Sequence, residues 1–296
     1  MAEKPVLYVD VLAQQCSIIY GTDKPERIDD YVINSAKRIH SLIIWDASQN
    51  AFFEAVALPP KISNENARYH IQFGAARRLE MIWYAYRNLA TMAPPDRLDP
   101  LASDESRQLM VDINIIYLNI RGTLDNLAWA LLHEFDPGRI QSMPASQVSL
   151  FLPGIRANPK FASLAAIVNQ HDAWDRDVKD RRDPAAHRIP LALPPAVLGP
   201  GDASRYRELE AEYSAAIRGH KFERADQILD AQRKLGKFQP WFVHEPAVGP
   251  IEIYPTVPDD LCHLVQLFEA IHGFLSADPG VKRTCACRSG SKPTRI

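Results

Sequence analysis

The chain has 296 residues, of which 46% are hydrophobic and 24% are charged, and its formal net charge at pH 7 is −2. This composition is typical of a globular protein with one large or two modest domains. The near-neutral charge excludes a surface that is strongly basic throughout. Four unevenly spaced cysteines exclude a disulfide framework. No apolar run reaches the length of a membrane span, and the first residues lack a signal-peptide pattern. We therefore expect a soluble, cytoplasmic protein without a membrane partner.

Residues 1–62 are expected to form an N-terminal α/β extension. The stretches "PVLYVDVL" and "CSIIYG" are rich in β-branched and aromatic residues, as short strands are. The longer stretch "PERIDDYVINSAKRIHSLIIW" predicts a helix that runs into a strand. The two prolines of "LPPK" close this first segment.

Two long helices are predicted next. Over residues 63–92, apolar residues recur at helical spacing after an N-cap at Ser63 or Asn64, and "APP" ends the pattern. Over residues 104–135, the same spacing holds throughout, Ser103 can cap the helix, and acidic residues occupy its first turn. Two helices of this length with a short connection predict an antiparallel hairpin.

The helix over residues 104–135 also carries a polar stripe. Four polar residues repeat every seven positions and therefore share one flank: Asp112, Asn119, Asn126 and His133. Such a stripe either packs in a hydrogen-bond network, stays exposed, or lines a polar groove. Gly122 is expected to allow a neighbouring group to pack closely.

A third helix is predicted to begin at Asn158 and Pro159, which suit the N-cap and the first helical position, and to run towards Arg182. An insertion at about 190–255 follows. It contains the extended segment "IPLALPP", a polar helical hairpin broken near "RGHK", and two short strands, "WFVHEP" and "IEIYP", that could pair with "IPLAL".

The last helix is expected to begin at Thr256-Val-Pro-Asp259, which resembles a capping box. A polar tail at 277–296 is expected to be flexible. Together, these elements predict a mainly α fold. It is an up-down bundle of four long helices over residues 63–276, with a small β element and a helical-hairpin insertion.

The segment "RRDPAAHR" at 181–188 concentrates groups that can act on a phosphate. Asp183 and Pro184 could simply begin a helical turn, with the arginines paired to nearby acids. Alternatively, metal-free RNA cleavage needs a base for the 2′-OH, a cation for the phosphorane and an acid for the leaving oxygen. His187 can be the acid or the base near neutral pH, and Arg182 can bind phosphate oxygens. Since one histidine cannot be both at once, a second copy of the chain would complete the site.

The pattern Arg182-Asp183-x-x-x-His187 resembles the R-x(4–6)-H signature of HEPN domains, and it falls between the third and fourth predicted helices, as in that family. The resemblance implies a homodimer whose two motifs face each other. It also implies a metal-independent endoribonuclease of the kind found in toxin–antitoxin, abortive-infection or RNA-processing systems. Arg182 would hold the scissile phosphate, His187 would be the general acid or base, and Asp183 would orient one of them. Arg181 and Arg188 could contact flanking phosphates. RNA and an antitoxin or other protein are the implied partners, and no cofactor is implied.

The alternative is a non-catalytic helical bundle that binds a protein partner or a nucleotide. In that case "RRDPAAHR" is a cap and a salt-bridge cluster. An enzyme is expected to turn Arg182 and His187 towards one open cleft. A scaffold is expected to pair Arg182 with Asp177 or Asp180 and to bury His187.

The stretch "CACRSGSK" resembles the start of the zinc-binding SEC-C motif, in which Cys285 and Cys287 would be ligands. No further Cys or His follows to complete a tetrahedral site, so these two thiols are only weak candidates for a metal site. Cys16 and Cys262 are expected to be core thiols.

Overall fold

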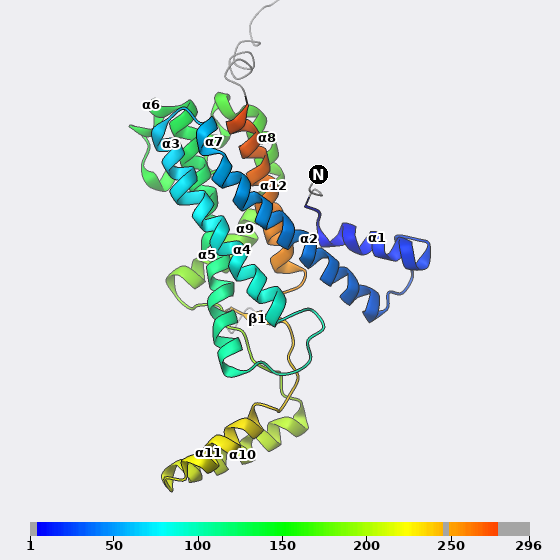
Figure 1. Cartoon of the computed structure of the whole chain (residues 1–296). Helices are drawn as coiled ribbons and strands as arrows, with labels where there is room; N and C mark the ends of the chain where they lie inside the picture. The colour runs from blue at the N-terminus through cyan, green and yellow to red at the C-terminus, as the bar shows by residue number, and fades with distance from the viewer. Residues whose placement is uncertain (1–4, 245–248, 278–296) are drawn as a thin grey trace, which may run out of the picture.

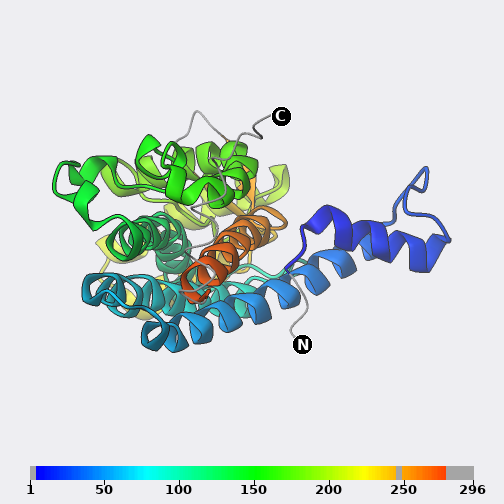
Figure 2. The same cartoon turned by 90° about the horizontal axis from the view of Figure 1, so that it is seen from above.

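The computed structural model describes residues 5–244 and 249–277, which form a mainly α-helical bundle with two projecting helical hairpins (Figure 1, Figure 2). None of the described helices is long and apolar enough to cross a membrane. The bundle is built from α2 (Asp30–Ala57), α3 (Glu65–Tyr69), η2 (His70–Ala75), α4 (Ala76–Met92), α5 (Ser103–Phe135), α8 (Ala162–Val168), α9 (Asp172–His187) and α12 (Thr256–Ser276). Short helical segments join these helices: η1 (Pro59–Lys61), α6 (Pro137–Ile140), η3 (Ala145–Gln147), α7 (Pro153–Arg156), η4 (Pro159–Phe161) and η5 (Asn169–His171).

The central helix of the bundle is α5, which packs against α3, α4, α9 and α12. The apolar residues that recur along it at helical spacing are fully buried, as the sequence predicts: Leu109, Ile113, Ile116, Ile120, Leu124, Leu127 and Leu131. Burying one such side chain contributes about 1.5–3 kcal/mol. This row of side chains therefore holds α5 against the neighbouring helices of the bundle. It also determines which residues of α5 point away from the core.

The predicted α/β extension is wrong, because the described part of residues 1–62 is helical. Residues Tyr8–Tyr20 form α1, which packs beside the beginning of α2. On α2, the buried residues that recur at helical spacing are mainly small, and they include Ala36, Ala47, Ala51 and Ala55. The bulky β-branched residues between them therefore resemble a strand in the sequence. Since α2 also packs against α4 and α12, the bundle already begins with α2.

The helix predicted over residues 63–92 forms, with one irregularity. As expected, Asn64 caps it: its Oδ1 accepts hydrogen bonds from the backbone N–H groups of Asn66 and Ala67. In the middle, η2 is a π-helical turn, which the spacing of apolar residues does not reveal. At the start of α5, the Ala102 N–H donates to Glu105 Oε2, so the predicted Ser103 cap is wrong and Ser103 is the first helical residue.

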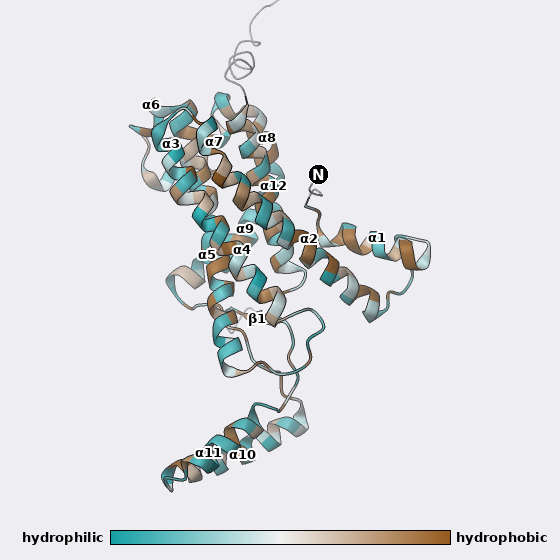
Figure 3. Cartoon of the chain, in the orientation of Figure 1, coloured by the Kyte–Doolittle hydropathy of each residue, from teal (hydrophilic) through white to brown (hydrophobic). Residues whose placement is uncertain are grey.

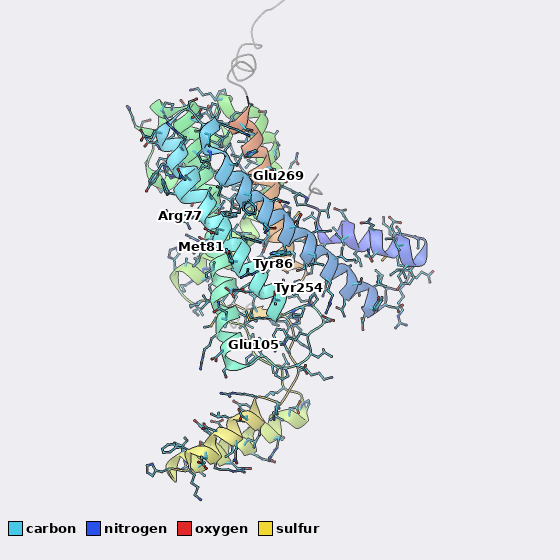
Figure 4. The ribbon with its side chains drawn as sticks, in the orientation of Figure 1. Arg77, Met81, Tyr86, Glu105, Tyr254 and Glu269 are labelled. Atoms are coloured by element: carbon cyan, nitrogen blue, oxygen red, sulfur yellow. The ribbon has the colours of Figure 1, made fainter. Side chains whose placement is uncertain are left out.

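A tyrosine hydroxyl joins α2 to α4 inside the bundle. Tyr86 Oη and Ser41 Oγ share a hydrogen bond of 2.8 Å. Figure 4 shows Tyr86 and Tyr254 in the middle of the bundle, and both are buried. The predicted capping box at Thr256 is wrong: Asp259 Oδ1 accepts a hydrogen bond from the Tyr8 N–H and so holds the N-terminal segment against α12.

The third predicted helix is built in two parts, α8 and α9. Asn158 Oδ1 accepts from the Lys160 N–H, so the predicted cap is present. The alternative that Asp183 and Pro184 begin a new helical turn is wrong, because α9 runs through both residues without a break. It ends at His187, where the N–H groups of the two following residues both donate to the Pro184 carbonyl.

The insertion forms the predicted hairpin, and of the two predicted strands only the first pairs with "IPLAL", while the second pairs with the first. Strands β1 (Trp241–Val243) and β2 (Pro250–Glu252) are antiparallel, and Ala192 of "IPLAL" pairs with Val243. Helices α10 (Pro200–Arg218) and α11 (Phe222–Gln232) form an arm that projects from the bundle (Figure 1). Figure 3 shows hydrophilic and hydrophobic residues interleaved along it, and four buried residues form its own small core: Leu209, Ala216, Ala225 and Ile228.

Candidate functional site

The last turns of α9 carry the residues of the R-x(4–6)-H pattern. Arg182 and Asp183 are partly exposed and form an ion pair in which Nη1 lies 3.0 Å from Oδ1. His187 is exposed at the end of the helix. Because successive helical residues are rotated by about 100°, positions five apart point about 140° away from each other. Within one chain, Arg182 and His187 therefore do not face one cleft, and Arg182 is paired with Asp183 rather than with Asp177 or Asp180.

Arg182 belongs to a cluster of charged groups on the face shared by α4, α5 and α9. Arg121 of α5 forms an ion pair with Asp175 of α9. Burial raises the pKa of Asp125, whereas Arg121, Arg182 and Arg78 lower it through their positive charges. The Nε atom of Arg182 is buried and has no hydrogen-bond partner among the described residues. We call Arg78, Arg121, Asp125, Asp175, Arg182 and Asp183 the arginine cluster; its three cations balance its three carboxylates.

Gly122 brings Arg78 close to the backbone of α5. A Cβ at this position would lie 2.4 Å from Arg78 Cζ, so no larger residue fits while the guanidinium stays there. Arg78 Nη1 in turn donates to Asn119 Oδ1 over 2.9 Å. The neighbour that Gly122 admits is thus a cationic side chain of the arginine cluster.

Three residues of the polar stripe of α5 pack in hydrogen bonds, which was one of the alternatives left open by the sequence, whereas His133 packs by ring stacking. The Asp112 carboxylate accepts hydrogen bonds from the Gln108 amide. Asn126 Oδ1 lies 3.2 Å from His70 Nδ1. The ring of His133 stacks on the ring of His70, and burial together with the charge of His70 lowers the pKa of His133.

Arg181, the residue before Arg182, points into the bundle. Its Nη2 donates to both carboxylate oxygens of Asp260, over 2.7 and 2.9 Å. Tyr117 Oη and Trp174 Nε1 also donate to this carboxylate, over 2.8 and 3.0 Å. Asp260 is 3% exposed, and burial raises its pKa to about 6 against the opposing effect of Arg181. The four groups tie α5, α9 and α12 together, so the structure places Arg181 in an internal ion pair rather than on a surface for flanking phosphates.

A surface pocket of about 440 Å³ lies beside this ion pair, and its lining includes Trp174, Asp177, Arg181, Asp260 and His263. His263 Nδ1 lies 3.0 Å from His171 Nδ1. Burial lowers the pKa of His263 to about 4, so its ring is neutral at pH 7. A second pocket, of about 630 Å³, lies between the beginning of α5 and the arm. Neither of these two pockets is lined by Arg182 or His187.

The other candidate residues of the sequence are Arg188 and the four cysteines. Arg188 follows α9 and is exposed. Cys16 and Cys262 are buried free thiols, as predicted. Cys285 and Cys287 lie outside the described residues. Within residues 5–244 and 249–277, no group of three or more His, Cys, Asp or Glu side chains could hold a metal ion.

The fold is thus a helical bundle with a small β element, and its best candidate surface is the α4–α5–α9 face. No protein-family model, no curated protein and no solved structure matches the chain.

Proposed function

We propose that the protein is an HEPN-like, metal-independent endoribonuclease that acts as a homodimer. The observation that carries this proposal is the different placement of two adjacent arginines on α9. Arg181 is bound inside by Asp260, with 15% of its side chain exposed, whereas Arg182 is 31% exposed on a face that also holds Arg78 and Arg121. Arg182 is therefore available for a phosphate, which would exchange with Asp183 as the partner of the guanidinium.

The angle between Arg182 and His187 makes a second copy of the chain necessary for this chemistry. In the proposed dimer, His187 of one protomer takes the proton of the ribose 2′-OH, and the 2′-oxygen attacks the phosphorus. Arg182 stabilises the charge of the phosphorane. The second protomer's imidazolium gives its proton to the leaving 5′-oxygen. The products carry a 2′,3′-cyclic phosphate and a 5′-OH. A cytoplasmic setting, with an antitoxin or another protein as a partner, fits this activity.

A second candidate function is a non-catalytic bundle that binds a protein partner or a nucleotide. The pairing within the arginine cluster favours it, because Arg121 is bound by Asp175 and Arg182 by Asp183. Paired in this way, the arginines can fix the positions of α5 and α9 without contacting any ligand.

The deciding experiment incubates the purified protein with a mixed RNA in EDTA and identifies the ends of the products. We expect cleavage that leaves 2′,3′-cyclic phosphates, and a loss of about 100-fold or more in Arg182→Ala and in His187→Ala. Arg176→Ala is the matched control for the first variant, because Arg176 is exposed on the same helix. His220→Ala, in the turn of the arm, is the control for the second. Equal activity in all four variants, or activity only with added metal, would contradict the proposal.

A further inference from the structure

We propose that a cluster of aromatic and imidazole rings at the junction of α3, η2 and α5 binds the bases of single-stranded RNA beside the arginine cluster. The rings belong to Tyr69, His70, Phe73, Trp129 and His133, and we call them the ring platform. The inference rests on the proposed function for its choice of ligand. It adds a second part to the site: a surface that holds a nucleotide next to the phosphate bound by Arg182.

Three rings of the platform are nearly parallel. The ring of His70 is inclined by 8° to that of Trp129 and by 18° to that of His133, with centroids 5.5 and 5.4 Å apart. Two further rings, of Tyr69 and Phe73, adjoin this group, and they are 61% and 44% exposed. Flat, partly exposed rings of this kind are the surfaces on which unpaired bases stack.

The local backbone is built to hold these rings in place. η2 is π-helical, an irregularity that is frequent at functional sites. Gly74 lies in it, and a Cβ there would be 2.0 Å from Asn126 Oδ1, so only glycine admits this amide. Asn126 Nδ2 donates to the Gly122 carbonyl over 2.7 Å, and its Oδ1 pairs with His70 Nδ1. The amide, itself held by the Gly122 carbonyl, thus contacts one nitrogen of the His70 ring and fixes its orientation.

The platform continues directly from the arginine cluster along α5. Trp129 follows Asp125 by one helical turn, which is about 6 Å along the axis, and therefore lies on the same face. Arg182 lies close enough to Asp125 for its charge to act on that carboxyl. A phosphate at Arg182 and a base on Trp129 would therefore lie along the same stretch of α5.

Two arginines lie beside the exposed rings of the platform and could bind the phosphates of a nucleic acid strand. The Arg77 guanidinium lies 4.9 Å from the centroid of the Phe73 ring, and Arg68 is exposed on α3. Figure 4 shows Arg77 and Met81 along the outer side of α4. On α5, Glu134 is held by the N–H groups of Ser63 and Asn64. Rings interleaved with arginines are typical of single-strand binding, in which stacking and phosphate contacts act together.

The experiment measures binding of the full-length protein to a fluorescent 2′-O-methyl oligonucleotide of ten residues, which cannot be cleaved through a 2′-OH. We expect Tyr69→Ala, Phe73→Ala and His133→Ala to weaken binding by about 10-fold to 100-fold, the usual effect of removing one stacked ring. His133→Phe keeps a ring without a titratable nitrogen and is expected to bind within about threefold of wild type. Phe222→Ala is the control, since Phe222 is a 61% exposed aromatic residue on the arm.

Three results would overturn the inference. The first is no binding by the wild type, and the second is equal binding by the alanine variants and the control. The third is a dimer that becomes monomeric in Tyr69→Ala and Phe73→Ala, because the rings would then be a protein interface. The outcome is separable from that of the proposed function. If these ring variants lose binding but no cleavage is seen, the platform stands without the nuclease. If Arg182→Ala loses cleavage while the ring variants bind and cleave normally, the nuclease stands without the platform.

Discussion

The ion pair between Arg181 and Asp260 provides a quantitative test of what holds α9 against α5 and α12. The substitution Arg181→Met removes the guanidinium and keeps most of the apolar stem. It leaves Asp260 with two neutral donors, Tyr117 Oη and Trp174 Nε1, and without a counter-charge. Removing one partner of a buried ion pair destabilises a protein by about 3–5 kcal/mol. Against a typical total of about 5–15 kcal/mol, this is a loss that lowers Tm by roughly 10 °C.

Urea unfolding followed by circular dichroism at 222 nm measures this loss, and a double-mutant cycle separates its parts. The variant Arg181→Met/Asp260→Asn has no buried charge at this position, so we expect it to recover about half of the lost free energy or more. The loss should also depend on pH. Burial already raises the pKa of Asp260 to about 6, and removing Arg181 raises it further. At pH 5 the carboxyl of the single variant is neutral, so its loss should be smaller than at pH 8.

The control is Arg176→Met, on the exposed side of the same helix, which should change the free energy of unfolding by about 0.5 kcal/mol or less. The reasoning is refuted if Arg181→Met loses less than about 1 kcal/mol at pH 8, below the range for a buried pair. It is also refuted if the double variant is no more stable than the single one. Either result would mean that the guanidinium contributes packing alone.

Three other perturbations test separate parts of the fold. Gly74→Ala should destabilise the protein by about 1–3 kcal/mol in urea, because its Cβ would displace the Asn126 amide. His40 is fully buried and its pKa is lowered from 6.5 to about 4, so unfolded chains take up a proton that folded chains do not. As the pH falls from 6.5 to 4, the wild type should lose about 3 kcal/mol more stability than His40→Gln. Replacing residues 199–235 by a four-residue Gly-Asn-rich turn should leave the far-UV spectrum helical and Tm within a few degrees, since Val197 pairs with Lys237 across the base of the arm.

The sequence predicts the elements whose signals are local and strong. The apolar period of α5 is carried by Leu and Ile, and the side chains of Asn64 and Asn158 cap as their positions suggest. The helical period of α2 is missed because alanines carry it. Alanine favours a helix at exposed and buried positions alike, so it does not mark which face of the helix is buried. The π-helical turn at η2 is missed for a different reason: it depends on the contact between Gly74 and Asn126, which are far apart in the sequence.

The buried ion pair leaves a signal in the sequence, although it is visible only when the two helices are read together. On α9, Arg181 follows Trp174 and Val178 at the spacing of one face, and both of these are buried. On α12, Asp260 follows Val257 by three residues on the apolar face. A charged residue on the inner face of a helix requires a partner. An acidic residue and a basic residue on the inner faces of two helices therefore predict an ion pair between those helices.

The same helical geometry connects the stability of the bundle with the proposed chemistry. Adjacent residues of a helix are rotated by about 100°, so a helix that commits Arg181 to the interior must turn Arg182 sideways, towards α5. There its positive charge acts on Asp125, which lies one turn before Trp129. The direction of Arg182 is thus set by the mostly buried ion pair between Arg181 and Asp260. An RNA strand bound at Arg182 and on the ring platform would then lie along α5, the central helix of the bundle, which keeps both halves of the site in register without a loop.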